Sequence, residues 1–263
     1  MPSFCTWHRR FTLKVLYPHD RFGFPAAHPR GNSHRPSDYL WYLRRTRHLA
    51  ACRWLLDPSP LNEQSVTLNA PQSDLAWLDI ALQLCSAGVL FAYGALALFL
   101  LAGSGIRLAM PKLSDISWGA GLAAFIGIPG LVLYVSAVHL GLSMEVIPTA
   151  FTNPWVEAPA LLLWSGANAF GEEIVVVMWL MTRLKHLGWS LPAIIGASSL
   201  LRGSYHLYQG VSAGFGNIIM GLVFCYFYHR TGRVWPLVIA HFLIDAIAFV
   251  GYSLLGDLSI FGL

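Results

Sequence analysis

Residues 158–181 read APALLLWSGANAFGEEIVVVMWLM, an apolar stretch that carries two adjacent glutamates, Glu172 and Glu173. A helix needs about 20 apolar residues to cross a membrane, so this stretch is long enough. A carboxylate at membrane depth is costly unless another group offsets its charge, and two neighbouring carboxylates resist joint ionisation. The stretch therefore predicts a transmembrane helix whose glutamates have a function and have partners elsewhere in the chain.

The composition extends this interpretation to the whole chain. Of 263 residues, 56% are hydrophobic and only 11% are charged, whereas soluble domains carry about 25% charged residues. We expect an all-α fold, a polytopic transmembrane helix bundle of about six to eight spans. The net charge of +4 does not indicate nucleic-acid binding, because the basic residues cluster near the start and at loop ends. The four cysteines have no C-x-x-C spacing, so neither a disulfide framework nor a zinc ribbon is predicted.

The chain divides into three regions by composition. Residues 1–75 hold ten of the seventeen Lys and Arg residues and no spanning apolar run, so we expect a basic, Pro- and His-rich N-terminal region that is disordered or interfacial. Within it, residues 39–56 have the composition of a basic amphipathic helix on a membrane surface. Residues 76–158 are expected to form N-terminal transmembrane helices, and 159–255 a transmembrane core. The apolar segments are 75–102, 118–140, 159–181, 191–208, 215–228 and 235–255.

The loops after the first, third and fifth apolar segments carry positive charge, and the intervening loops lack Lys and Arg. Cytoplasmic loops are enriched in these residues, so the alternate loops are predicted to be cytoplasmic, in a multi-pass protein of the plasma (inner) membrane. The same rule disfavours the basic N-terminal region on the opposite side, where this topology would place it. The loop residues concerned are Arg107, Lys112, Arg183, Lys185, Arg230 and Arg233.

Polar residues recur four apart in three of the later apolar segments. Residues at this spacing share one face of a helix, and ionisable groups inside a membrane face the bundle interior and pair with one another. We therefore expect one internal site, to which a further segment adds Asn217. The three pairs are Asn168 with Glu172, Arg202 with His206, and His241 with Asp245; Glu173 adjoins the first.

This set of residues suits hydrolysis inside a bilayer. A buried glutamate paired with a histidine can activate water, and a second histidine can donate hydrogen bonds to the oxyanion that develops. A divalent metal such as zinc is also chemically possible, with Glu172, His206 and His241 as its ligands. The chain has no H-E-x-x-H and no G-x-S-x-G, so neither the ordinary zinc-peptidase signature nor a serine nucleophile is indicated.

The order and spacing of these residues resemble the CPBP (Abi) family of intramembrane glutamic endopeptidases, which are related to the type II CAAX prenyl endopeptidases. The resemblance covers about residues 159–250. It implies that Glu172 activates water with Glu173 as its partner, and that His206 works with Glu172. It also implies that His241 and Asp245 stabilise the oxyanion. Residues 159–255 would then be the catalytic core, acting on a peptide or protein substrate at the membrane.

Two positions depart from the family pattern. Val177 stands where the first motif has arginine, and Arg202 stands where the second has an aromatic residue. We interpret these changes as linked, the cation having moved to the helix of His206, where it lowers the cost of the glutamate pair. Arg202 and Asn168 are thus supporting residues. An ionised Asp245 would oppose an oxyanion, so it should be protonated or should orient His241.

Three functions remain open from the sequence. The first is a CAAX protease-like endopeptidase whose partners are its substrate and the lipid bilayer, with no nucleic acid and no cofactor assigned. The second is a non-catalytic scaffold, or an immunity or partner-binding protein on the same fold, which the valine at position 177 favours. The third is an ion-coupled transporter, because Glu and His chains also form proton relays. Transporters of this kind often contain internal repeats, and none is seen here.

Overall fold

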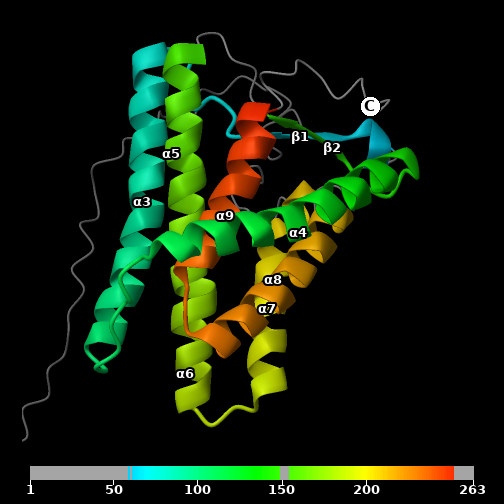
Figure 1. Ribbon diagram of the computed structural model, residues 1–263. Helices are drawn as coiled ribbons and strands as arrows, with labels where there is room; N and C mark the ends of the chain where they lie inside the picture. The colour runs from blue at the N-terminus through cyan, green and yellow to red at the C-terminus, as the bar shows by residue number, and fades with distance from the viewer. Residues whose placement is uncertain (1–58, 60, 149–153, 252–263) are drawn as a thin grey trace, which may run out of the picture.

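The computed structural model describes residues 59, 61–148 and 154–251, and these form a bundle of helices (Figure 1). One long helix changes character along its length: α5 (Pro154–Glu172) passes through a π-helical segment (Glu173–Trp179) into α6 (Leu180–His186). A second π-helical segment (Ile247–Gly251) extends the last helix. The other helices are α3 (Ala76–Ala102), α4 (Leu113–His139), α7 (Leu191–His206), α8 (Val211–Thr231) and α9 (Trp235–Ala246), with short 3-10 turns at Leu61–Glu63 and Leu207–Gln209.

The helices follow the apolar segments of the sequence. Four are long and apolar enough to cross a membrane: 76–102, 113–139, 157–186 and 211–231. Within the described residues α7 and the 235–251 helix are shorter, with 16 and 17 residues. The prediction of an all-α transmembrane bundle is confirmed, and the chain is an integral membrane protein. The α7 helix and the 235–251 helix both fall short of the about 20 residues that a full span needs.

A pair of parallel strands, β1 (Ser65–Leu68) and β2 (Glu145–Pro148), lies at one end of the bundle, with Ser65 opposite Glu145. Sequence patterns did not reveal it, because strands of four residues separated by two helices carry no local pairing signal. Because β1 belongs to the basic N-terminal region of residues 1–75, the last part of that region is ordered against the bundle. Residues 1–58, including the amphipathic helix expected at 39–56, lie outside the described part.

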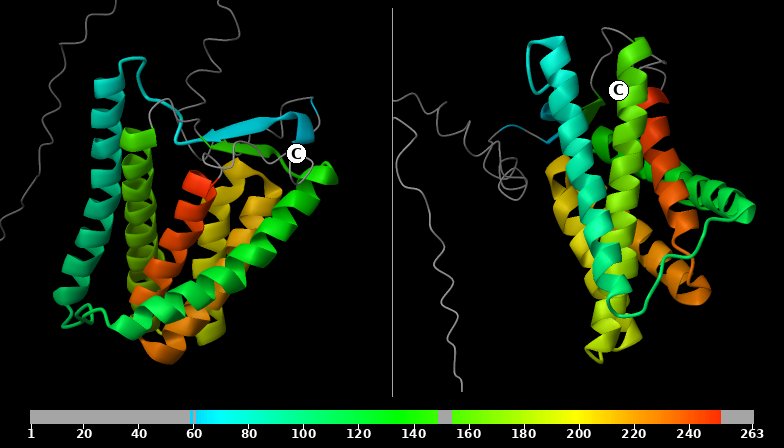
Figure 2. Two further views of the ribbon diagram at one scale, coloured as in Figure 1. Left: turned by 45° about the horizontal axis from the view of Figure 1, so that its top comes forward. Right: turned by 90° about the vertical axis from the view of Figure 1, so that its left-hand side faces the viewer.

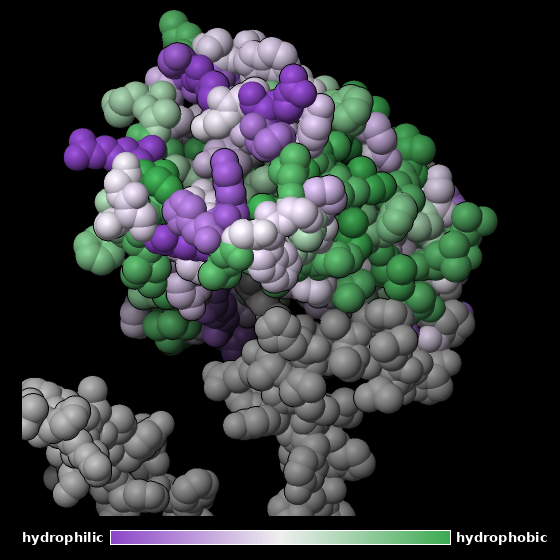
Figure 3. Space-filling view, turned by 90° about the horizontal axis from the view of Figure 1, so that it is seen from below, coloured by the Kyte–Doolittle hydropathy of each residue, from purple (hydrophilic) through white to green (hydrophobic). Residues whose placement is uncertain are grey.

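The basic loops gather at the other end. In Figures 1 and 2 the connections 103–112, 187–190 and 232–234 all lie at the lower end, opposite the strands. Figure 3 views this end, where hydrophilic residues cluster between apolar ones. One contact at this end is structural: Arg233 Nη2 lies 2.5 Å from Oδ1 of the fully buried Asp115 and ties the α8–α9 connection to the start of α4. The alternation of basic loops along the sequence thus corresponds to two distinct ends of the molecule.

Glycines allow the closest helix contacts. A Cβ on Gly221 of α8 would lie 2.9 Å from the Cα of Ser199 on α7, and one on Gly203 would lie 2.8 Å from the carbonyl oxygen of Gly214. On the other side of the bundle, a Cβ on Gly171 would meet the carbonyl oxygen of Leu90 at 2.9 Å, where α3 and α5 run side by side (Figures 1 and 2). Small residues that permit backbone approach are the usual basis of helix association in lipid.

Candidate active site

The glutamate pair lies where α5 becomes π-helical. Glu172 is the last residue of α5 and Glu173 the first of the π-helical segment. The two carboxylates occupy different environments, because the Glu172 side chain is 20% exposed and the Glu173 side chain is fully buried. π-Helical segments inside α-helices are rare and occur frequently at functional sites. The wider turn thus begins at the pair that the sequence singled out.

Glu173 is bound by an arginine and a histidine. Its Oε1 accepts a hydrogen bond from Arg202 Nη2 at 2.6 Å, and Nδ1 of His241 lies 2.8 Å from the same oxygen. Arg202 is fully buried, and its guanidinium lies 5.6 Å from the centre of the Phe224 ring. A buried charge is tolerated only when it is paired and hydrogen-bonded, so these three side chains stabilise one another.

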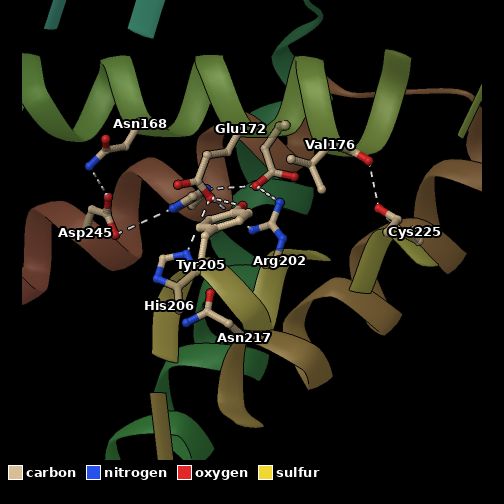
Figure 4. A network of polar contacts seen from close by, with 12 residues as sticks. Asn168, Glu172, Val176, Arg202, Tyr205, His206, Asn217, Cys225 and Asp245 are labelled. Atoms are coloured by element: carbon tan, nitrogen blue, oxygen red, sulfur yellow. Dashed lines mark hydrogen bonds and ion pairs between the residues drawn. The ribbon is translucent and has the colours of Figure 1, made fainter. Parts of the chain in front are cut away.

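Glu172 has one engaged oxygen. Its Oε2 accepts a hydrogen bond from the Tyr205 hydroxyl at 2.7 Å. His206 Nε2 lies 3.6 Å from this oxygen and Arg202 Nη1 lies 3.9 Å from it. Within the described part of the chain, Oε1 of Glu172 takes part in no hydrogen bond. Figure 4 shows Glu172 pointing toward Tyr205 and His206.

His241 and Asp245 complete the site from α9. Nε2 of His241 lies 3.7 Å from Oδ1 of Asp245. The side-chain amide of Asn168 donates to Oδ2 of Asp245 at 3.4 Å, which joins α5 to α9 (Figure 4). Asp245 therefore lies between a histidine and an amide, hydrogen-bonded to the amide and beyond hydrogen-bond distance of the histidine.

A pocket of about 260 Å³ opens beside these side chains. Its inner wall contains Glu172, His206, His241 and Asp245, and its outer wall includes residues 67–70 from β1 and the loop that follows. Glu172 lines this pocket and Glu173 does not. The pocket therefore extends from the middle of the bundle toward the end that carries the strands.

Comparison with known protein families agrees with the motifs. Residues 153–247 match the family model described as Rce1-like, the type II CAAX prenyl endopeptidases. This segment is an Rce1-like domain. No curated protein and no solved structure matches the chain. The family predicted from the motifs is thereby confirmed over residues 153–247, close to the 159–250 expected, and it is a family of membrane proteases.

The Rce1-like domain contains every predicted site residue, and the structure brings all of them except Asn217 together. The glutamates meet His206 and Arg202 from α7, and His241 and Asp245 from α9, with Asn168 at the edge. Asn217 instead donates to the Ala213 carbonyl of its own helix, and among the described residues it forms no hydrogen bond with either glutamate. The side chains of the three predicted polar stripes therefore share one site.

The positions of Val177 and Arg202 agree with the interpretation that the cation of the family motif has moved to the helix of His206. Val177 is fully buried in an apolar cluster that includes Phe224 and Leu237. Arg202 reaches both glutamates from α7. The expected contact between Arg202 and the glutamate pair is confirmed.

Sequence reasoning missed three contributors. Tyr205 precedes His206, and its hydroxyl, which needs a partner when buried, binds Glu172. Gln83 of α3 lines the pocket and accepts a hydrogen bond from Trp164. Ser198 contacts the π-helical segment. Gln83 gave the same signal as the glutamates, a polar residue inside an apolar span, whereas the partners of Tyr205 and Ser198 depend on tertiary packing.

The predicted metal ligands do not form a metal cage. Across the described residues, no three or more His, Cys, Asp or Glu side chains are arranged to hold a metal ion. Of the three ligands considered, Glu172 is held by Tyr205, His241 is directed at Glu173, and His206 lies beyond hydrogen-bond distance of Glu172. The geometry therefore gives no support to a zinc site at Glu172, His206 and His241.

Proposed function

We propose that the chain is an intramembrane endopeptidase that hydrolyses peptide bonds of membrane-associated substrates with a water activated by Glu172. The observation that carries the proposal is the asymmetry of the Glu172 carboxylate. Oε2 is held by Tyr205 and faces His206, while Oε1 is left without a described partner in a residue that lines the pocket. A carboxylate fixed through one oxygen presents the other as a positioned base.

In the proposed reaction a carbon–oxygen bond forms, the carbon–nitrogen bond of the peptide breaks, and Glu172 carries one proton from water to the leaving nitrogen. Glu172 Oε1 takes a proton from water as the water oxygen attacks the peptide carbonyl carbon, which produces a tetrahedral oxyanion. The same proton then passes to the amide nitrogen, and the carbon–nitrogen bond breaks to release an amine and a carboxylic acid. Glu173 supports this step without contacting the substrate, because it is fully buried and bound to Arg202 and His241.

The oxyanion needs hydrogen-bond donors, and two histidines are available. His241 Nε2 is 3.7 Å from Asp245, longer than a hydrogen bond, so an N–H on this nitrogen is available to a substrate oxygen. Neither ring nitrogen of His206 has a hydrogen-bond partner among the described residues. Both histidines line the pocket. Donors placed where charge develops are the usual means of stabilising such an intermediate.

Cleavage of a peptide library by the purified protein tests the proposal. Glu172→Gln keeps the shape of the side chain and removes the base, so we expect cleavage to fall by about 10²- to 10⁴-fold, the usual contribution of a general base. His206→Ala should also lower the rate. Leu200→Ala, on the exposed face of the same helix as His206, is the matched control and should cleave normally. Full activity of Glu172→Gln would overturn the proposal.

Two further measurements test whether the reaction needs a metal and whether the protein is non-catalytic. We expect cleavage to persist in a chelator, and its loss would assign a metal to the mechanism. A protein that cleaves no peptide, and whose biological function survives Glu172→Gln, would be a scaffold or partner-binding protein instead. We further propose that the enzyme resides in the plasma (inner) membrane and that its partner is a peptide or protein substrate there.

A further inference from the structure

Side-chain amides are the most frequent polar group around the pocket. They come from the loop after β1, from α3, from α5 and from the turn between α7 and α8. A carboxamide carries both a donor and an acceptor, as a peptide group does. Among the described residues that line the pocket there is no Lys or Arg that would select an acidic group. The five amides are Asn69, Gln72, Gln83, Asn168 and Gln209.

Gln83 has its orientation fixed by its neighbour. The indole nitrogen of Trp164 lies 2.5 Å from Gln83 Oε1. An indole N–H only donates, so the amide oxygen of Gln83 must face Trp164. The NH₂ group has no hydrogen-bond partner among the described residues and borders the pocket. Gln83 therefore presents a donor.

Asn168 has the opposite polarity. Its amide nitrogen donates to Asp245 Oδ2 at 3.4 Å. The Asn168 side-chain oxygen thus faces away from Asp245 and is engaged by no other described residue. Asn168 therefore presents an acceptor in the same pocket to which Gln83 presents a donor.

The spacing along α5 places Asn168, and Trp164 with its partner Gln83, on the same side of the helix as Glu172. Trp164, Asn168 and Glu172 follow one another at intervals of four residues, on one helix face. Four helical residues rise about 6 Å, so Asn168 lies about 6 Å and Trp164 with Gln83 about 12 Å along the helix from Glu172. An extended peptide advances about 3.3 Å per residue. Asn168 thus lies level with the second residue from the cleaved bond, and Gln83 with the third or fourth.

We propose that Gln83 and Asn168 bind the main chain of an extended substrate, Gln83 donating to a carbonyl and Asn168 accepting from an N–H. Both act on one side of the cleaved bond. The inference rests on the proposed peptidase function and names its substrate class: a segment with an accessible, extended backbone that is recognised through its main chain. Gln83 lies outside the Rce1-like domain, so the N-terminal helices contribute to specificity.

Backbone-modified peptides bound to the Glu172→Gln protein test this inference. The starting peptide is the best substrate of the library, or its tightest ligand if none is cleaved. In analogues, one carbonyl at a time is replaced by CH₂, or one amide nitrogen is methylated. Replacement of the carbonyl three or four residues from the cleaved bond should weaken binding roughly 10-fold, as loss of one hydrogen bond does. Methylation of the amide nitrogen of the second residue from the cleaved bond should also weaken binding roughly 10-fold, because it removes the N–H that Asn168 accepts from.

The decisive comparison is made in Gln83→Leu. With Gln83→Leu added, the Glu172→Gln protein should bind the unmodified peptide about as weakly as Glu172→Gln alone binds the analogue that lacks this carbonyl. Replacement of the carbonyl should then have no further effect on binding. Trp164→Phe keeps the ring but removes the N–H that orients Gln83, so it should reduce the same sensitivity. Leu84→Ala, exposed beside Gln83 on α3, should bind as the parent does.

The two proposals fail in different ways. If Gln83→Leu remains fully sensitive to the carbonyl replacement, or if no backbone position matters, main-chain binding is overturned even when the wild type cleaves the peptide. If binding depends on Gln83 but the wild type cleaves nothing, the peptidase proposal fails and the binding site stands.

Discussion

At the scale of single residues, Arg202 and Val177 determine how the glutamates are tolerated. A buried Glu173 without a cation would be an uncompensated charge, and breaking a buried pair by removing one partner costs about 3–5 kcal/mol. The family pattern has arginine one turn after the pair, and here Val177 at that position packs among apolar side chains. Arg202 provides the cation from α7 at 2.6 Å instead. The site thus keeps its charge balance although the motif is altered.

An exchange of the two positions tests whether the cation has moved. Arg202→Phe alone should lose most activity and lower the melting temperature, because the buried Glu173 loses its arginine and keeps only His241 as a partner. Val177→Arg alone should also destabilise the protein, because it adds a second cation and bulk to a packed core. The double variant restores both family positions, so part of the activity and stability should return. Cleavage rates and thermal melts of the four proteins measure this, and a double variant no better than Arg202→Phe would contradict it.

At the scale of elements, the π-helical segment depends on α7. In a π-helix the hydrogen-bond pattern shifts by one residue, so carbonyls near the transition need other partners. The Val176 carbonyl accepts a hydrogen bond from Ser198 Oγ at 2.7 Å, and Cys225 Sγ lies 3.2 Å from the same hydroxyl (Figure 4). Ser198 lies one turn before Arg202. One face of α7 therefore stabilises both the widened turn and the charge of Glu173.

Removal of this hydroxyl should loosen the widened turn. Ser198→Ala leaves a buried carbonyl without its partner, which costs about 1–3 kcal/mol. We expect a lower melting temperature and slower cleavage, with peptide affinity little changed, and Ser198→Thr should restore part of both losses. The matched control is Ser204→Ala on the exposed side of the same helix, whose hydroxyl binds only the Leu201 carbonyl of its own turn. Equal effects of Ser198→Ala and Ser204→Ala would contradict the role.

These elements also mark what sequence can predict. The apolar spans and the i, i+4 pairs follow from local periodicity, so the helices and the meeting of Glu172, His206 and His241 were predicted. The π-helical segment was not, because its Val176 carbonyl is hydrogen-bonded by Ser198 of another helix, a contact that local sequence does not reveal. The β1–β2 pair was missed for the same reason. Register between segments 80 residues apart is set by the assembled bundle and not by the four residues of each strand.

At the scale of the whole molecule, charge and pocket lie at opposite ends. Among the described residues, the Lys and Arg outside the site all lie in or beside the connections 103–112, 182–190 and 229–234. The pocket reaches the other end, where β1 and the α7–α8 turn border it. If the basic end is cytoplasmic, the pocket opens on the outer side of the membrane. The substrate segment would then be a tail or loop exposed on that side.

Cysteine labelling in intact cells tests this sidedness. In a parent with Cys5, Cys52 and Cys85 replaced, the buried Cys225 should not react with a membrane-impermeant maleimide. Ser65→Cys, exposed on β1, should be labelled from outside, because it lies at the end that lacks basic loops. Lys185→Cys, exposed at the basic end, should be labelled only after the cells are permeabilised. The reverse pattern would place the pocket on the cytoplasmic side. The ten basic residues of the N-terminal region, and not the three loops, would then fix the orientation.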